Sequence, residues 1–95
     1  MLIPADQIKP IHYEKARELI EEELQLAIKK HPYWPDDFLH GLAVIQEELG
    51  ETFKACVDHT YFGGRNLEQI RHELAQTGCT VIRMLAYIER VNDGL

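Results

Sequence analysis

Apolar residues recur at intervals of three and four along three long segments of this chain, and two short breaks separate the segments. This spacing puts the apolar side chains on one face of a helix. The first break is His31-Pro32-Tyr33-Trp34-Pro35, because two prolines this close together prevent a helix from continuing. The second break is the Gly63-Gly64 turn. The pattern therefore predicts an all-α fold, with helices at about residues 11–30, 36–59 and 67–91 after an irregular lead-in at 1–10.

The chain has 95 residues, which is enough for a single domain with one small core. The apolar stripes expected to form that core are broad on the second and third helices. They comprise Phe38, Leu42, Ile45, Leu49, Phe53 and Cys56 on the second helix, and Ile70, Leu74, Val81, Leu85 and Ile88 on the third. Because such broad faces leave apolar surface to cover, we expect the three-helix unit to assemble into a larger helical bundle, as a homodimer or homotetramer.

The charge and the apolar runs restrict where the protein acts. The formal net charge of −6 argues against binding to nucleic acid polymers and to anionic membranes. No stretch is apolar over the length needed to cross a bilayer. The first six residues lack the basic start and the long apolar run of a signal peptide. We therefore expect a cytoplasmic protein.

Two acidic strings lie inside helical segments: Glu47-Glu48-Leu49-Gly50-Glu51 in the second helix and Glu73-Leu74-Ala75-Gln76 in the third. In each string, two oxygen-bearing side chains stand three positions apart and project from one helix face. These side chains border the apolar stripes, where a charge is costly unless something compensates it. A divalent cation held by oxygen ligands from two facing helices would compensate it. The alternative is a solvated acidic helix face, which is the commoner origin of such strings.

The two strings and the residues around them resemble a known family, the MazG-like all-α nucleoside triphosphate pyrophosphohydrolases. The hallmark of that family is EExxE on one helix followed by ExxD on the next. The run from His40 to Glu48 is similar to the segment that precedes the motif in short phage and prophage members, and the run from Glu73 to Met84 is similar to their third helix. The resemblance extends over about residues 11–90, and it implies one MazG-like helical domain.

The resemblance implies an enzyme that uses Mg²⁺, or Mn²⁺ in its place, to cleave a nucleoside or deoxynucleoside triphosphate into a monophosphate and pyrophosphate. It implies that Glu48, Glu51 and Glu73 are metal ligands and that Glu47, with Glu48, takes part in catalysis by orienting water or holding a second ion. It also implies a role in nucleotide-pool housekeeping and a pocket completed by more than one subunit.

Gln76 departs from the family pattern, since it stands where the motif has aspartate. Its amide oxygen can occupy the fourth ligand position, but one negative charge is lost from the metal site. The chain is then a slow enzyme, an enzyme with one bound ion, or a binder without turnover. The alternative function is a non-catalytic helical module for oligomerisation, interaction or nucleotide binding, with a degenerate metal site.

Four further residues are candidates for substrate binding, and three of them have a structural alternative. Lys54 contacts a phosphate or forms a surface ion pair with Glu51 or Glu47. Arg65, after the glycine turn, grips a β- or γ-phosphate. Trp34 stacks on a base or plugs the end of the bundle. His40 borders the nucleotide pocket or is a partly exposed histidine.

Other features are interpreted from their spacing alone. If the second and third helices run antiparallel with their acidic strings facing, Cys56 and Cys79 are about 16 Å apart and remain free thiols. Gly41, Gly50 and Gly78 indicate either relaxed sequence or close approach between helices. Glu21-Glu22-Glu23 is most simply a solvated face, although one of these glutamates can approach the metal.

Overall fold

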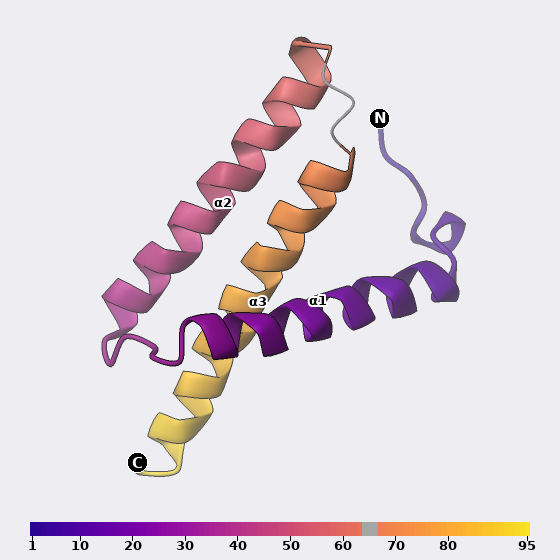
Figure 1. Ribbon diagram of the computed structural model, residues 1–95. Coiled ribbons are helices and arrows are strands. Elements are labelled where there is room, and N and C mark those ends of the chain that lie inside the picture. Colours follow the sequence, from indigo (N-terminus) through magenta and orange to yellow (C-terminus); the bar gives the residue numbers. More distant parts are fainter. Residues whose placement is uncertain (64–66) are drawn as a thin grey trace.

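The computed structural model describes residues 1–63 and 67–95, and these residues fold into three α-helices (Figure 1). The helices are α1 at Pro10–Lys30, α2 at Phe38–Tyr61 and α3 at Leu67–Asn92, and no strand occurs in the described residues. The prediction of an all-α fold is confirmed. The lead-in contains a short 3-10 helix at Ala5–Gln7, and α2 begins two residues later than predicted.

The helix starts follow from local chemistry. Pro10 is the first residue of α1, where its missing N–H costs nothing, and the backbone N–H of Lys9 donates to Nδ1 of His12 over 3.0 Å. Asp37 caps α2, because its carboxylate accepts from the backbone N–H of Leu39 over 3.2 Å. These contacts set where α1 and α2 begin.

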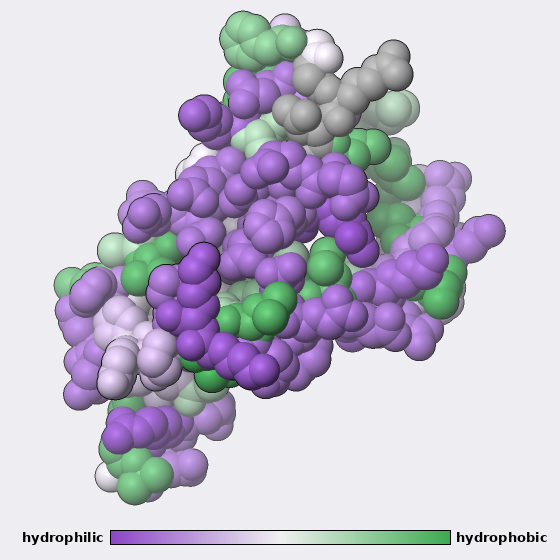
Figure 2. Space-filling model, viewed as in Figure 1, coloured by the Kyte–Doolittle hydropathy of each residue, from purple (hydrophilic) through white to green (hydrophobic). Residues whose placement is uncertain are grey.

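The chain is arranged as an antiparallel pair, α2 and α3, with α1 lying across α3 (Figure 1). In the described residues, the backbone of α1 approaches α3 closely but has no such approach to α2. The face that carries α1 is mainly hydrophilic, with smaller apolar areas between polar side chains (Figure 2). No described helix combines the length and the apolar character that a membrane span requires.

Two of the three helical glycines allow close packing. A Cβ on Gly41 would lie 2.8 Å from Sδ of Met84, and a Cβ on Gly78 would lie 2.9 Å from Cδ1 of Ile20. Gly50 has no such neighbour within 4 Å. The interpretation as close helix approach therefore holds at Gly41, between α2 and α3, and at Gly78, between α3 and α1, but not at Gly50.

Fewer residues are buried in the single chain than the apolar stripes led us to predict. The buried residues besides Gly41 are Thr52, Ala55, Ala75 and Cys79. Most of the stripe on α2 is exposed: the exposed fraction is 52% for Leu49 and 71% for Phe53. The prediction that these residues fill the core of one chain is wrong, because α2 has one helical neighbour and the face it turns to α3 carries small and polar residues.

The cysteines agree with the predicted antiparallel arrangement. Cys56 is half-buried, Cys79 is buried, and both are free thiols. The thiol of Cys79 donates to the backbone oxygen of Ile20 over 3.4 Å, and burial raises its pKa to about 11. Cys79 is therefore a packing residue of the contact between α1 and α3.

Candidate metal centre

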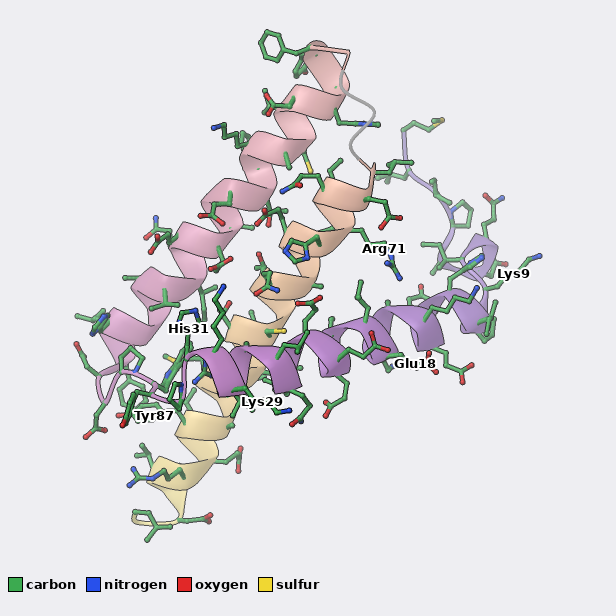
Figure 3. The ribbon with its side chains drawn as sticks, in the orientation of Figure 1. Lys9, Glu18, Lys29, His31, Arg71 and Tyr87 are labelled. Atoms are coloured by element: carbon green, nitrogen blue, oxygen red, sulfur yellow. The ribbon has the colours of Figure 1, made fainter. Side chains whose placement is uncertain are left out.

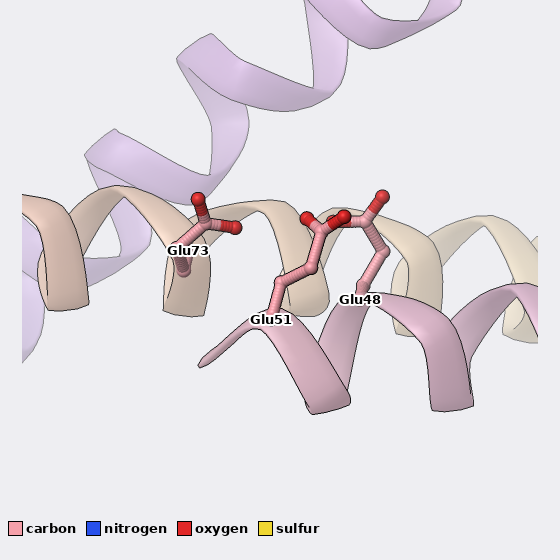
Figure 4. Close-up of side chains that lie close together, drawn as sticks. All are labelled: Glu48, Glu51 and Glu73. Carbon is pink, nitrogen blue, oxygen red and sulfur yellow. The ribbon is translucent and has the colours of Figure 1, made fainter. Parts of the chain in front are cut away.

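Three carboxylates converge between α2 and α3, and we call them the carboxylate triad: Glu48, Glu51 and Glu73 (Figure 4). One oxygen from each lies within 4.8 Å of one oxygen from each of the others. Glu48 and Glu51 share a face of α2 because they are three positions apart, and the antiparallel packing brings Glu73 of α3 opposite them. The structure thus brings together the three glutamates that the sequence predicts as metal ligands.

The environment of the triad disfavours negative charge. The pKa of Glu48 is raised above its ordinary value of 4.5, first by burial and then by the nearby charges of Glu51, Glu73 and Glu47, while His72 partly offsets the rise. In the described ranges 1–63 and 67–95, no lysine or arginine forms a salt bridge with the triad. Three hard oxygen donors with an uncompensated charge are a suitable ligand set for Mg²⁺ or Mn²⁺. The residues present therefore fit a divalent cation.

Hydrogen bonds hold the triad in place. Gln69, one turn earlier on α3, donates from Nε2 to Oε1 of Glu73 over 2.7 Å. Thr52 donates to the backbone oxygen of Glu48 over 3.1 Å, and Thr77 donates to that of Glu73 over 3.0 Å. The two hydroxyls also lie 3.0 Å apart across the helix interface, where either one can donate to the other in place of its own backbone acceptor. This bond fastens α2 to α3 one turn from the carboxylates.

Gln76, the predicted fourth ligand, lines the same cleft as the triad. Its Nε2 donates a short hydrogen bond to Oε2 of Glu23, which comes from α1. Oε1 of Glu23 also lies 3.9 Å from Nδ1 of His72. Of the three consecutive glutamates on α1, Glu21 and Glu22 are exposed as a solvated face requires, whereas the side chain of Glu23 is 16% exposed.

The cleft has a volume of about 680 Å³, and its walls carry charges of both signs. The acidic side chains are those of the triad and Glu23, and Gln76 and His72 also line the cleft. The last turn of α1 and the residue after it supply Lys29, Lys30 and His31. Figure 3 shows Lys29 and His31 at the end of α1 that crosses α3. The sequence gives no signal for these residues beyond a lysine pair that suits a helix C-terminus.

The predicted substrate residues are dispersed around the triad. Lys54 lines a neighbouring hollow together with Glu51 and Glu73, so it lies beside the triad but outside the main cleft. His40 is exposed near the start of α2 and is not among the residues that line the cleft. This position agrees with its interpretation as an exposed histidine. Glu47 is exposed on α2 next to Glu48. Arg65 lies outside the described residues.

Trp34 has the position of a plug at the end of the bundle, the second of its two interpretations. The guanidinium carbon of Arg83 lies 5.1 Å from the ring centroid of Trp34, and Nε1 of the ring faces the crevice at Gly41 and is buried. Arg83 is itself fixed, because it donates to the backbone oxygens of His31 over 2.7 Å and Tyr33 over 3.2 Å. One face of the Trp34 ring is thus covered by Arg83 and the ring edge is packed at Gly41, while base stacking by Trp34 stays a prediction.

Comparison of the chain with models of protein families, with curated proteins and with solved structures found no match. The functional interpretation therefore depends on the local geometry of the carboxylate triad and of the cleft beside it. That geometry combines three converging carboxylates with neighbouring side chains of positive charge.

Proposed function

We propose that this protein is a divalent-cation-dependent nucleotide pyrophosphohydrolase, which cleaves a nucleoside or deoxynucleoside triphosphate to a monophosphate and pyrophosphate. The single observation that carries this proposal is the convergence of Glu48, Glu51 and Glu73 from two facing helices. Three carboxylates are held close together at the margin of the core, where an uncompensated charge is costly. The motif resemblance supports the reaction type, because these are the positions that it identifies as metal ligands.

The ligand set proposed for Mg²⁺ is the triad, with Gln76 as the fourth oxygen donor. When bound, the ion supplies charge neutralisation on the phosphates and a more acidic water molecule. The protein's own contribution is the placement of the ligands by α2 and α3 and their fixation through Gln69, Thr52 and Thr77.

The lysines at the end of α1 are proposed to bind the polyphosphate. Lys29 and Lys30 line the same cleft as the triad, so a chain of phosphates bound in the cleft can contact both the ammonium groups and the proposed cation. Glu47 is exposed and adjacent to Glu48, where its carboxylate is proposed to accept a proton from the attacking water. Lys54, beside Glu51, is a second phosphate contact on the far side of the triad.

One observation favours a second candidate function, a nucleotide-binding or interaction module without turnover. Gln76 contributes no negative charge, and its amide nitrogen is already bonded to Glu23. A cation held by three carboxylates would bind more weakly than one held by four, so the site could bind a nucleotide together with its own cation without positioning that cation for turnover. The two functions differ in turnover, not in binding.

Pyrophosphate release from a panel of nucleoside and deoxynucleoside triphosphates distinguishes the two candidates. The proposed enzyme releases pyrophosphate and the monophosphate in equal amounts, and it does so only when Mg²⁺ or Mn²⁺ is present. Nucleotide binding without product over long incubation would favour the binding module. Release of orthophosphate in place of pyrophosphate would contradict the proposed reaction.

The active unit is proposed to be a homodimer or homotetramer, and the exposed apolar residues of α2 and α3 support this assembly. We define the outer face as Leu42, Leu49 and Phe53 of α2 with Leu74, Val81 and Leu85 of α3, which are exposed by 40–71%. On each helix these residues share one side, which on α2 is opposite to the side of Glu48 and Glu51 and on α3 is about a quarter-turn away from Glu73. Two copies that pack through their outer faces would form a four-helix layer and keep both cation sites open.

Substitution of the outer face tests the assembly. Phe53→Glu is expected to convert the oligomer to a monomer, because a carboxylate would be buried against the partner's apolar residues. Light scattering after gel filtration measures the mass, and Glu18→Lys on the exposed side of α1 is the matched control. An oligomer of unchanged mass in Phe53→Glu, or a monomeric parent protein, would contradict the proposed interface.

A further inference from the structure

The structure assigns a positioning role to Glu23 of α1: its carboxylate holds the amide of Gln76 so that the amide oxygen, and not the nitrogen, is available to a cation at the triad. This inference rests on the proposed cation site. Glu23 lies on α1, a helix that carries no member of the triad, and it contributes to the site through Gln76.

The direction of the hydrogen bond determines which end of the amide is free. An ionised carboxylate only accepts hydrogen bonds, so the group of Gln76 that faces Glu23 must be its NH₂. Nε2 of Gln76 donates to Oε2 of Glu23, and both side chains line the cleft of the triad. The amide oxygen is therefore the end left to face a cation. Without this bond the amide can rotate and present its NH₂, which repels a cation.

Glu23 is itself held from several sides. Its other carboxylate oxygen lies 3.9 Å from Nδ1 of His72 on α3. The backbone of α1 is fixed one turn earlier, where Gly78 lets Ile20 approach α3 closely and the thiol of Cys79 donates to the backbone oxygen of Ile20. The side chain of Glu23 is 16% exposed. The contact between α1 and α3 thus sets the position from which Glu23 holds Gln76.

The pair Glu23–Gln76 offsets the weakness of an amide as a ligand. An amide oxygen carries no net charge and binds Mg²⁺ more weakly than a carboxylate oxygen does. The negative charge of Glu23 polarises the amide through the hydrogen bond and adds a fourth carboxylate to the cleft. Outer partners of this kind orient the ligands of a metal, and their loss reduces metal affinity by roughly 10–100-fold in other proteins.

Mn²⁺ binding to the full chain, measured by electron paramagnetic resonance without nucleotide, tests this role. Glu23→Ala is expected to weaken Mn²⁺ affinity by about 10-fold or more. Glu23→Gln is expected to weaken it less, because the new amide oxygen can still accept from Gln76. The exchanged variant Glu23→Gln/Gln76→Glu keeps the hydrogen bond with its direction reversed, so its affinity should return to within a few-fold of the parent protein. Glu22→Gln, on the exposed side of α1, is the matched control.

The outcomes separate the role of Glu23 from the cation site itself. Unchanged Mn²⁺ affinity in Glu23→Ala, or an exchanged variant no better than Glu23→Ala, would overturn the positioning role while the cation site stands. A parent protein that binds no Mn²⁺ would overturn both. Helix content and melting temperature without metal identify a variant that fails to fold. If Glu23→Ala fails to fold, the Mn²⁺ affinities of Glu23→Gln and of the exchanged variant test the positioning role. A merely structural contact would lower the melting temperature without changing Mn²⁺ affinity.

Discussion

Glu73→Gln is expected to lower the rate of pyrophosphate release by at least about 100-fold, which corresponds to roughly 2.7 kcal/mol of activation free energy. Glu73 is the member of the triad that α3 supplies, and the substitution removes its negative charge while keeping its shape. The new amide can still accept from Gln69 through its oxygen, so the helix pair should remain folded. The loss of rate would therefore reflect the cation site and not a loss of structure.

The matched control for this prediction is Glu68→Gln. Glu68 lies on the first turn of the same helix, it is highly exposed, and its partner is Arg71 at 3.7 Å. A surface ion pair of this kind contributes little to stability, so the control should keep the parent rate. Turnover in Glu73→Gln within about threefold of that in Glu68→Gln would remove Glu73 from the mechanism.

Glu48→Gln is expected to have opposite effects on stability without and with Mg²⁺. Because the pKa of Glu48 is raised in the folded state, ionisation of this group destabilises the metal-free protein as pH rises above 4.5. Removing the charge should therefore make the metal-free variant more stable than the parent protein at pH 7. This advantage should disappear as the pH falls below 4.5, where Glu48 is protonated in both the folded and the unfolded state.

Mg²⁺ should reverse this order. A ligand that binds only the folded state stabilises it by about 2.7 kcal/mol at a concentration of 100 times Kd. For a domain of this size that corresponds to an increase in melting temperature on the order of 10 °C or more. The parent protein should show this increase and Glu48→Gln should lose most of it, while KCl at equal ionic strength is the control for screening. Equal responses of both proteins to Mg²⁺ would contradict the assignment of Glu48 as a ligand.

The triad could be predicted from the sequence because it depends on local geometry and one packing contact. Spacing of three puts Glu48 and Glu51 on one helix face, and a short connection between α2 and α3 makes an antiparallel pair that brings Glu73 opposite them. The helix breaks were equally predictable, since prolines after Lys30 and a glycine turn after Phe62 interrupt any helix.

The roles of α1 could not be predicted in the same way. Glu23 and Lys29 reach the cleft because α1 crosses α3, and the crossing is set by the close approach at Gly78. A helical pattern shows which side of α1 is apolar, but it does not determine where along α3 that side packs. From the sequence alone, Glu23 is therefore interpreted as part of a solvated helix face, and Lys29 as a residue that suits a helix C-terminus. Only the place where α1 crosses α3 shows that both line the cleft.

The extent of the core depends on the number of neighbours that each helix has, which a single sequence does not specify. Leu49 and Phe53 share a stripe with half-buried Ile45, as their spacing predicts, but one chain supplies no fourth helix to cover them. Trp34 illustrates the same limit. Its place in a proline-rich connection does not specify what the ring contacts, and only the packing of α3 brings Arg83 over one ring face.

Anomalous diffraction from crystals of the full chain soaked in Mn²⁺, recorded at a wavelength where manganese scatters strongly, tests most directly whether the triad binds a divalent cation. We expect an anomalous peak between the side chains of Glu48, Glu51 and Glu73, with ligand oxygens at the short distances typical of hard cations, and no such peak in Glu73→Gln. A well-ordered triad with no anomalous peak at saturating Mn²⁺, or a peak held by other residues only, would contradict the account.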